Sequence, residues 1–370
     1  MKKIKIVAVL LSLFVSMTIP ASASASLSMF TWVHTSDGMG QGSPSTFPDT
    51  FAFAFSPNYA IDDTLYAGTY IGVYRSTDKG LTWANKMPST LPAINSLSVS
   101  PADSTGNTLI ASSEDGILQT TNRFDSSSGI GPSGLGVSLA VYSPDYVHDH
   151  MIFAGTDGNG VRAKTNTLSW FSLDEGTVLG KVTGIVFDPN YSVNHIFYVA
   201  SYGHGVYKGD GGANLSSWTW TELNTGLDTS NKKFVSAIAI SPNFGIDQTF
   251  FIATDSVGIY KSIDAGQHWN VAYDNFVFQT LLFSPNYAKD RTIYSGEIGS
   301  GVYRSTDGGA TWNQMNHGFA DPVHGGSVLT LAFAPGKPTN LFAGFFGGND
   351  GGVWQFLFPV SQVFIPLVMK

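Results

Sequence analysis

The chain has 370 residues, no cysteine and a formal net charge of −8. Without cysteine there are no disulfides, so burial of apolar side chains must stabilise the fold. An aromatic share of 13% together with 41 glycines suits a large all-β core. The acidic balance argues against a nucleic-acid partner, because phosphate binding requires clustered lysine and arginine.

The first 25 residues have the pattern of a secretory signal peptide. Three lysines within the first five residues precede an uncharged apolar run over 6–19, and a small-residue cleavage pattern ends at Ala25. The run is short for a bilayer span, and no other segment reaches 18 consecutive apolar residues. We therefore predict a signal peptide over 1–25 and a secreted or cell-surface chain without a transmembrane helix. Without the leader lysines the net charge falls from −8 to −11.

Seven repeats follow, and each is marked by a proline after an apolar run. The intervals between these anchors are 43 to 53 residues. Leucine-rich repeats are shorter, whereas four-stranded propeller blades have this length. The residues directly before the anchor prolines are Ser56, Ser100, Ser143, Asp188, Ser241, Ser284 and Ala334.

Each repeat predicts four strands in the same order. The first strand is an apolar run before the anchor, such as 51–55 or 235–240, and its density suits a strand buried on both faces. The second strand follows a polar turn. The third is a short Gly-Val-Tyr type segment, such as 72–74 or 301–303, and the fourth begins at a tryptophan. Helical periodicity is nowhere sustained after Ala25.

The turn between the first two strands repeats the pattern Asn-Tyr/Phe-x-x-Asp-x-Thr. It occurs at 58–64, 243–249 and 286–292. Because the aspartate recurs at one repeat position, we expect it to bond the backbone of its own turn and not to hold a metal. The aspartates at this position are Asp62, Asp149, Asp247 and Asp290.

A second turn, between the third and fourth strands, has the pattern Ser-x-Asp-x-Gly-x-Thr/His-Trp. Its serine and aspartate can satisfy hairpin donors, its glycine supplies a positive φ, and its tryptophan can pack against the next blade. We predict structural roles for Ser76, Asp78, Gly80, Trp83, Ser262, Asp264, Gly266, Trp269, Ser305, Asp307, Gly309 and Trp312.

This second turn resembles the Asp-box, or BNR, repeat of sialidase-type β-propellers, and the likeness extends over about residues 27–358. Photosystem II assembly factors and sortilin-type receptors have similar propellers. The resemblance implies an all-β fold, a seven-bladed β-propeller of four-stranded antiparallel blades. We expect one propeller domain over 26–358, then an apolar, proline-containing tail over 359–370.

Ring closure is also predictable. The last repeat supplies three strands but no proper Asp-box and fourth strand, whereas 30–39 has the Thr-Trp of a fourth strand with nothing before it. We therefore predict that the N-terminal strand completes the seventh blade, which removes the open edges of the ring.

The catalytic sets of the enzymatic relatives are not found in the sequence. Sialidases need three converging arginines, a tyrosine nucleophile with its glutamate, and an aspartate acid. This chain has five arginines, and two of them, Arg75 and Arg304, share one repeat position before an Asp-box. Xyloglucanases place their substrate between two propellers, and here we expect one. The resemblance therefore favours a monomeric, non-enzymatic binding or scaffold propeller without cofactor or metal.

The loops that join the second and third strands are the predicted binding site. In a propeller they gather at one mouth of the channel, and outside a shared glycine they differ between repeats, as expected where a site is grafted onto a repeated frame. Carboxylates with interleaved aromatics could bind a cation, a sugar or a basic peptide, so we expect an extracellular glycan or protein ligand. The candidates are Tyr70, Glu114, Asp115, Asp157, Tyr202, His204, Asp255, Glu297 and Asp350.

Two alternatives stay open. A glycan-active hydrolase could use two carboxylates of this face, drawn from Glu114, Glu297, Asp157 and Asp255. The same residues could also form a solvated acidic surface without a ligand. His204 lacks the spaced partners of a metal site.

Overall fold

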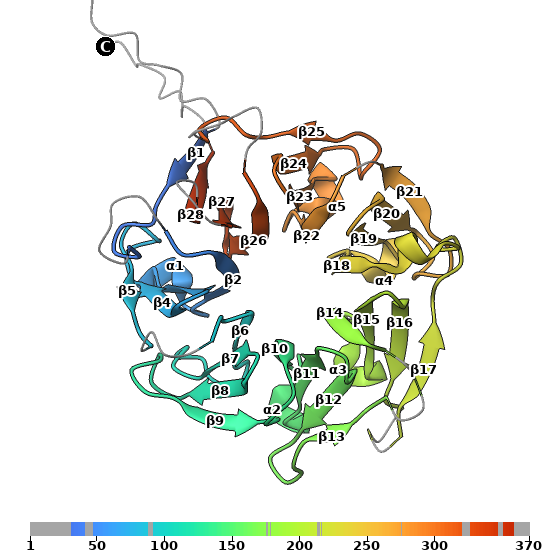
Figure 1. Cartoon of the computed structure of the whole chain (residues 1–370), viewed down its shortest axis with the longest axis horizontal. Coiled ribbons are helices and arrows are strands. Elements are labelled where there is room, and N and C mark those ends of the chain that lie inside the picture. Colours follow the sequence, from blue (N-terminus) through green and yellow to red (C-terminus); the bar gives the residue numbers. More distant parts are fainter. Residues whose placement is uncertain are drawn as a thin grey trace, which may run out of the picture.

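The computed structural model describes residues 31–358, with gaps at 41–46, 88–91, 175–176, 178, 213–214, 216, 275, 320–325 and 347–350. The predicted signal peptide and C-terminal tail lie outside the described residues. The strands form seven antiparallel sheets of four strands each, arranged in a ring (Figure 1). The predicted seven-bladed β-propeller is therefore confirmed.

Six blades use four consecutive strands, ordered from the inner edge of the ring to the outer edge, and blade 7 takes its outermost strand from the N-terminal part of the described chain (Figure 1). Blade 1 contains β2 (Thr50–Phe55), β3 (Leu65–Thr69), β4 (Gly72–Ser76) and β5 (Ala84–Asn85). Blade 2 contains β6 (Ser96–Val99), β7 (Leu109–Ser113), β8 (Gly116–Thr120) and β9 (Ser128–Gly131). Blade 3 contains β10 (Val137–Tyr142), β11 (Ile152–Thr156), β12 (Val161–Lys164) and β13 (Phe171–Ser172).

The other blades follow the same plan. Blade 4 contains β14 (Lys181–Phe187), β15 (Ile196–Tyr202), β16 (Gly205–Asp210) and β17 (Thr219–Glu222). Blade 5 contains β18 (Val235–Ile240), β19 (Phe250–Thr254), β20 (Gly258–Ser262) and β21 (Asn270–Tyr273). Blade 6 contains β22 (Phe278–Phe283), β23 (Ile293–Glu297), β24 (Gly301–Ser305) and β25 (Asn313–Gln314). Blade 7 contains β26 (Val328–Ala334), β27 (Lys337–Phe345), β28 (Gly352–Leu357) and β1 (Thr31–His34).

Burial is deepest on the second strands, not on the first strands as the sequence suggested. Every residue of β3 is buried, as is every residue of β19, whereas buried and half-buried residues alternate along β2. The first strand of each blade lies at the inner edge of the ring, so one set of its side chains faces inward instead of packing against a neighbouring blade. The core therefore lies between blades, around the second and third strands.

The Asn-Tyr/Phe-x-x-Asp-x-Thr turns contain single-turn helices, which are too short to show helical periodicity in the sequence. Their aspartates bond the turn as predicted: the Asp62 carboxylate accepts from the Thr64 amide at 3.0 Å and from the Ser56 hydroxyl at 2.7 Å. The helices are α1 (Tyr59–Asp62), α2 (Tyr146–Asp149), α3 (Tyr191–Asn194), α4 (Phe244–Asp247) and α5 (Tyr287–Asp290), and a 3₁₀ helix, η1, spans Ser230–Lys233.

The turns between the third and fourth strands are held by their own side chains. Ser305 Oγ donates to the Asp307 carboxylate at 2.8 Å and accepts from the Gly309 amide at 2.8 Å. Hydrogen bonds from the hydroxyl and the amide of Thr311 lower the pKa of Asp307 to about 2. The carboxylate is thus engaged within its own turn.

In five blades a tryptophan at the fourth strand donates a hydrogen bond to the preceding blade, whereas the sequence pattern suggested packing against the next one. Trp83 in blade 1 donates to the Thr35 carbonyl of blade 7 at 2.6 Å, and Trp269 in blade 5 donates to the Leu223 carbonyl of blade 4 at 2.7 Å. The contact requires glycine beside it, since a Cβ on Gly226 would lie 2.3 Å from the Trp269 carbonyl oxygen.

The N-terminal strand closes the ring as predicted. β1 pairs antiparallel with β28, with Trp32 opposite Phe356, and forms the outer edge of blade 7. The seventh blade therefore combines residues from both ends of the described chain.

Candidate functional site

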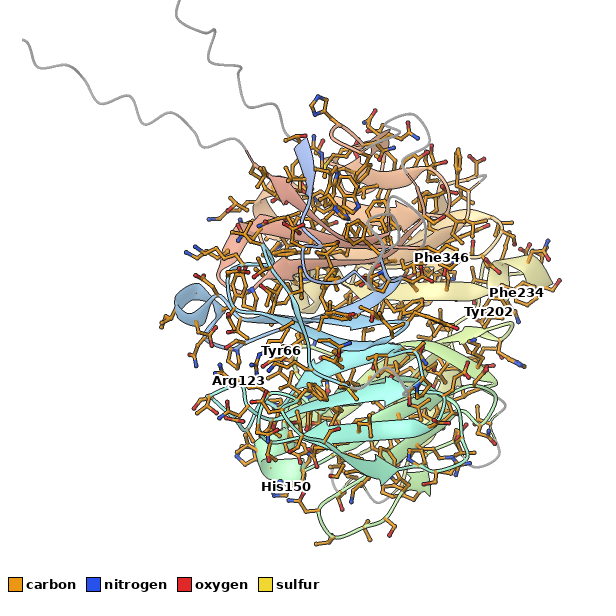
Figure 2. The ribbon with its side chains drawn as sticks, turned by 60° about the vertical axis from the view of Figure 1, so that its left-hand side comes forward. Tyr66, Arg123, His150, Tyr202, Phe234 and Phe346 are labelled. Carbon is orange, nitrogen blue, oxygen red and sulfur yellow. The ribbon has the colours of Figure 1, made fainter. Side chains whose placement is uncertain are left out.

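The loops of the propeller divide between two faces. The loops that join second to third strands and fourth to first strands lie on one face, which we call the mouth face. Figure 2 shows Tyr202, Phe234 and Phe346 on this side of the ring, while Arg123 and His150, from the other two sets of turns, lie on the opposite side. The two faces therefore present separate sets of side chains.

One position in each second-to-third-strand loop forms a ring around the mouth, which we call the rim. In five blades the backbone N–H of this residue donates to the preceding loop, as Tyr70 does to the Asp49 carbonyl at 3.0 Å and Asp255 does to the Phe234 carbonyl at 2.9 Å. Glu114 and Tyr202 stand fourteen residues after the anchor of their blades, as Tyr70 and Asp255 do. Three rim residues are acidic, and the other four are large apolar or aromatic residues with exposures of 37 to 63%. In blade order the rim is Tyr70, Glu114, Asp157, Tyr202, Asp255, Ile298 and Phe346.

A second ring lies deeper, on the innermost strands. In six blades the residue of this ring is the extra residue at a β-bulge, where the pairing register of the first strand shifts. Ser138, between the paired residues Val137 and Leu139, is an example. In blade 2 it is Asn95, which precedes β6. We call this the bulge ring, and it consists of Phe51, Asn95, Ser138, Thr183, Ser236, Gln279 and Leu329.

The bulge ring lines a cavity of about 370 Å³ in the centre of the propeller. All seven blades contribute to its wall. Glu114 and Asp157 of the rim also line it, as does Lys181 at the start of β14. The structure therefore brings two of the predicted carboxylates together in one cavity.

Hydrogen bonds from the bulge ring tie neighbouring blades together. Thr183 Oγ1 donates to the Val235 carbonyl of the next blade at 2.7 Å, and Ser236 Oγ donates to the Phe278 carbonyl at 2.5 Å. Asn95 likewise donates to the next blade, as does Ser138. These donors are thus committed to the frame of blades 2 to 6.

Blades 7 and 1 interrupt this polar ring. Their bulge residues are Leu329 and Phe51, and their rim residues are Phe346 and Tyr70. Both rings are therefore apolar or aromatic in the same two blades. The mouth has an apolar sector over blades 7 and 1, next to an acidic sector formed by Glu114 and Asp157 in blades 2 and 3.

Two of the three rim carboxylates, Asp157 and Asp255, contact a polar side chain. Lys181 Nζ lies 3.7 Å from the Asp157 carboxylate. In the neighbouring part of the rim, the Tyr202 hydroxyl donates to the Asp255 carboxylate, and the Tyr202 ring packs against Phe234 with centroids 4.9 Å apart. Asp157 and Asp255 are therefore both partly neutralised or bonded within the mouth.

The sequence predicted Glu297 as a ligand-binding residue at the mouth. In the structure it stands one residue before the rim position and its side chain is buried in the protein interior. Its side chain is 4% exposed, in the position that Thr69 and Thr254 occupy in other blades. Successive side chains on a strand point to opposite faces, so Ile298 takes the rim position instead. Burial raises the pKa of Glu297, and its Oε2 has no hydrogen-bond partner among the described residues.

The remaining candidates are dispersed. Asp115 lines a separate cavity of about 150 Å³ beside β8 and β9. His204 is half-buried, and its carbonyl accepts a hydrogen bond from Asn224 at 2.8 Å. Tyr70 is exposed on the rim, and Asp350 lies outside the described residues.

Within the described part of the chain, no group of three or more histidine or acidic side chains is arranged to hold a metal ion. The same residues include no helix with the length and apolar character needed to cross a membrane.

Sequence reasoning missed Lys181, Ile298, Phe346 and the whole bulge ring. A constant spacing could have identified most of them. Each bulge-ring residue stands five positions before its anchor residue, as Ser138 does before Ser143, and six of the seven rim residues stand fourteen positions after it. Aligning the repeats on their anchors would have placed the bulge ring and six of the seven rim residues, and would have assigned the blade 6 rim position to Ile298 instead of Glu297.

The comparisons with known proteins concern the fold. No protein-family model matches the chain, and no curated protein matches its sequence. Solved structures do match. The GH74 xyloglucanase of Xanthomonas campestris is 17% identical, with a TM-score of 0.61, and the match covers 90% of this chain and 54% of the xyloglucanase. The chain thus spans about half of that enzyme.

Two further structures have the same blade arrangement. The extracellular domain of a one-component system from B. thetaiotaomicron is 14% identical, with a TM-score of 0.64 and coverage of 88% of this chain and 40% of that one. A YCF48 structure bound to D1 peptide is 14% identical, with a TM-score of 0.58 and coverage of 87% and 99%. This chain is a propeller. At such low identity the likeness shows the fold alone.

Proposed function

We propose that this chain is a secreted, non-enzymatic Asp-box propeller that binds an extracellular glycan or protein at its mouth. The observation that carries the proposal is that the strands and turns repeat from blade to blade, whereas the residues of the rim and the bulge ring do not. The rim and the bulge ring differ from blade to blade, and all seven bulge-ring residues line one cavity of about 370 Å³ together with Glu114 and Asp157 of the rim. A cavity of this size, with mixed apolar and charged walls, has the properties of a ligand site.

The structural neighbours are consistent with a binding role. One is the extracellular domain of a one-component system, and another is bound to a peptide. A propeller of this fold thus forms part of an extracellular domain in one neighbour and belongs to a peptide complex in the other. The apolar run and cleavage pattern over 1–25 support export, which mass spectrometry of the exported chain would test by locating its N-terminus.

The state of the carboxylates argues against hydrolysis. A two-carboxylate mechanism needs both groups to reach the substrate. Glu297 is 4% exposed, and Asp255 accepts a hydrogen bond from Tyr202. Asp157 faces Lys181 at 3.7 Å. These arrangements favour binding over catalysis.

A glycan-active hydrolase is the second candidate, because Glu114 and Asp157 line the same cavity. The two functions are separated by screening the chain from residue 26 on a glycan array and assaying hydrolysis of the same glycans. Binding without hydrolysis, weakened by Glu114→Gln, supports the proposal. Hydrolysis that Glu114→Gln abolishes would establish the enzyme instead.

A further inference from the structure

The acidic sector of the mouth favours a cationic group. Glu114 is exposed on the rim and Asp157 follows in the next blade, and both border the central cavity. Among the described residues that line this cavity, Lys181 carries the positive charge, and its side chain is 49% exposed. Lys181 balances Asp157, which leaves the charge of Glu114 to attract a cation from solution.

The apolar sector favours a hydrocarbon group beside that cation. Tyr70 is 63% exposed and Phe346 is 57% exposed, so both offer surface that a ligand would remove from water. Phe51 and Leu329 continue this surface into the cavity. Blade 1 is the neighbour of blade 2, so the apolar sector adjoins Glu114.

The polar wall offers few neutral donors to a sugar. The hydroxyls of Ser138, Thr183 and Ser236 already donate to carbonyls of the next blade, and the Tyr202 hydroxyl donates to Asp255. A neutral glycan needs donors and acceptors at fixed positions as well as flat aromatic faces.

We infer that the mouth binds a peptide segment in which a lysine or arginine neighbours an apolar side chain. The cationic group meets Glu114, and the apolar group packs on Phe51, Tyr70 and Phe346. This inference rests on the proposed function and names its ligand class. Charge complementarity supports it, since the chain carries −8 overall.

The test measures fluorescence anisotropy of a fluorescein-labelled peptide that alternates lysine with leucine, added to the chain from residue 26. Matched peptides replace lysine by glutamate or leucine by serine, and both should bind more weakly. We expect Glu114→Gln to weaken binding of the parent peptide by about fivefold, the upper range for an exposed charge pair. Phe51→Ser should weaken it by about tenfold through lost apolar contact.

Two further variants keep the test decisive. Phe346→Ser changes an exposed rim residue, so it reports the apolar contact even where Phe51→Ser unfolds the chain. Asp63→Asn removes a carboxylate on the opposite face, beside α1, and should leave binding unchanged.

The outcomes separate this inference from the proposed function. Peptide binding that responds to neither Glu114→Gln nor Phe346→Ser overturns the inference. A glycan that binds at the mouth, while the lysine and leucine peptide does not, overturns the inference and leaves the proposed function standing. No binding in either assay overturns both.

Discussion

Trp32, in the first strand of the described chain, donates a hydrogen bond from its indole Nε1 to the Met315 carbonyl oxygen in blade 6, at 2.6 Å. Its ring also stacks on Phe319, with centroids 5.3 Å apart. Because β1 pairs with β28, this one side chain links the N-terminal strand to two blades. The seam of the ring thus depends on a contact between residues almost 300 positions apart in the sequence.

We predict that Trp32→Ala lowers the free energy of unfolding by about 3 to 5 kcal/mol, the range for truncating a buried aromatic side chain. The indole is 2% exposed and loses both its ring contacts and its hydrogen bond. Urea denaturation measures the change. The control is Val33→Thr on the same strand, a side chain 39% exposed, which should change stability by less than about 0.5 kcal/mol. Equal effects of the two variants would contradict a closing role for Trp32.

The bulge ring gives a second prediction. Thr183→Val keeps the shape of the side chain but removes the donor to the Val235 carbonyl, so it should lower the free energy of unfolding by about 1 kcal/mol. Thr183→Ser retains the hydroxyl and should lose less. Thermal denaturation of both variants compares them, and a valine variant as stable as the serine variant would show that the interblade bond contributes nothing.

Glu297 gives a prediction with a definite pH dependence. Burial raises the pKa of this carboxyl above its usual value of 4.5, so the folded chain binds a proton that the unfolded chain has released. The group therefore costs stability as pH rises from the unfolded pKa through the folded pKa. Glu297→Gln removes this cost, and its stability relative to the parent chain should be higher at about pH 8 than at about pH 4.

Glu222→Gln is the matched control for that measurement, because the pKa of Glu222 is shifted in the opposite direction from that of Glu297. The hydrogen bond from Asn224, together with that from Lys233, lowers the pKa of Glu222, so this exposed carboxylate contributes stability above its unfolded pKa and loses it as pH falls. Urea denaturation at both pH values compares the variants. A relative stability of Glu297→Gln that does not change with pH would show that burial does not raise the pKa of this carboxyl.

Most of the fold was predictable from the sequence, because seven anchors and three intact turns repeat with nearly constant spacing. The site was less predictable for a physical reason. Strand side chains alternate between faces, so an error of one residue replaces Ile298 by Glu297. Ser138 lines the cavity as the extra residue at a break in the pairing register between Val137 and Leu139. Such breaks depend on sheet pairing, which a local apolar pattern does not encode.

Lys181 gives a prediction about ligand charge. Its ammonium group lies 3.7 Å from Asp157, so a cationic ligand competes with it for the same carboxylate. Lys181→Gln should therefore strengthen binding of the lysine and leucine peptide by about threefold, as expected for an exposed charge pair. Lys79→Gln, on the opposite face, is the control and should have no effect. Anisotropy titrations measure both, and weaker binding after Lys181→Gln would show that the mouth prefers an anion.

The most direct test of a binding mouth is hydrogen–deuterium exchange of the chain from residue 26, with and without the lysine and leucine peptide. Ligand at the mouth should slow exchange of backbone amides in 112–116 and 154–160, which contain the rim residues Glu114 and Asp157. Exchange in 58–64 and 286–292, the helical turns of the opposite face, should stay the same. Protection confined to those turns, with none around the rim, would contradict the central claim.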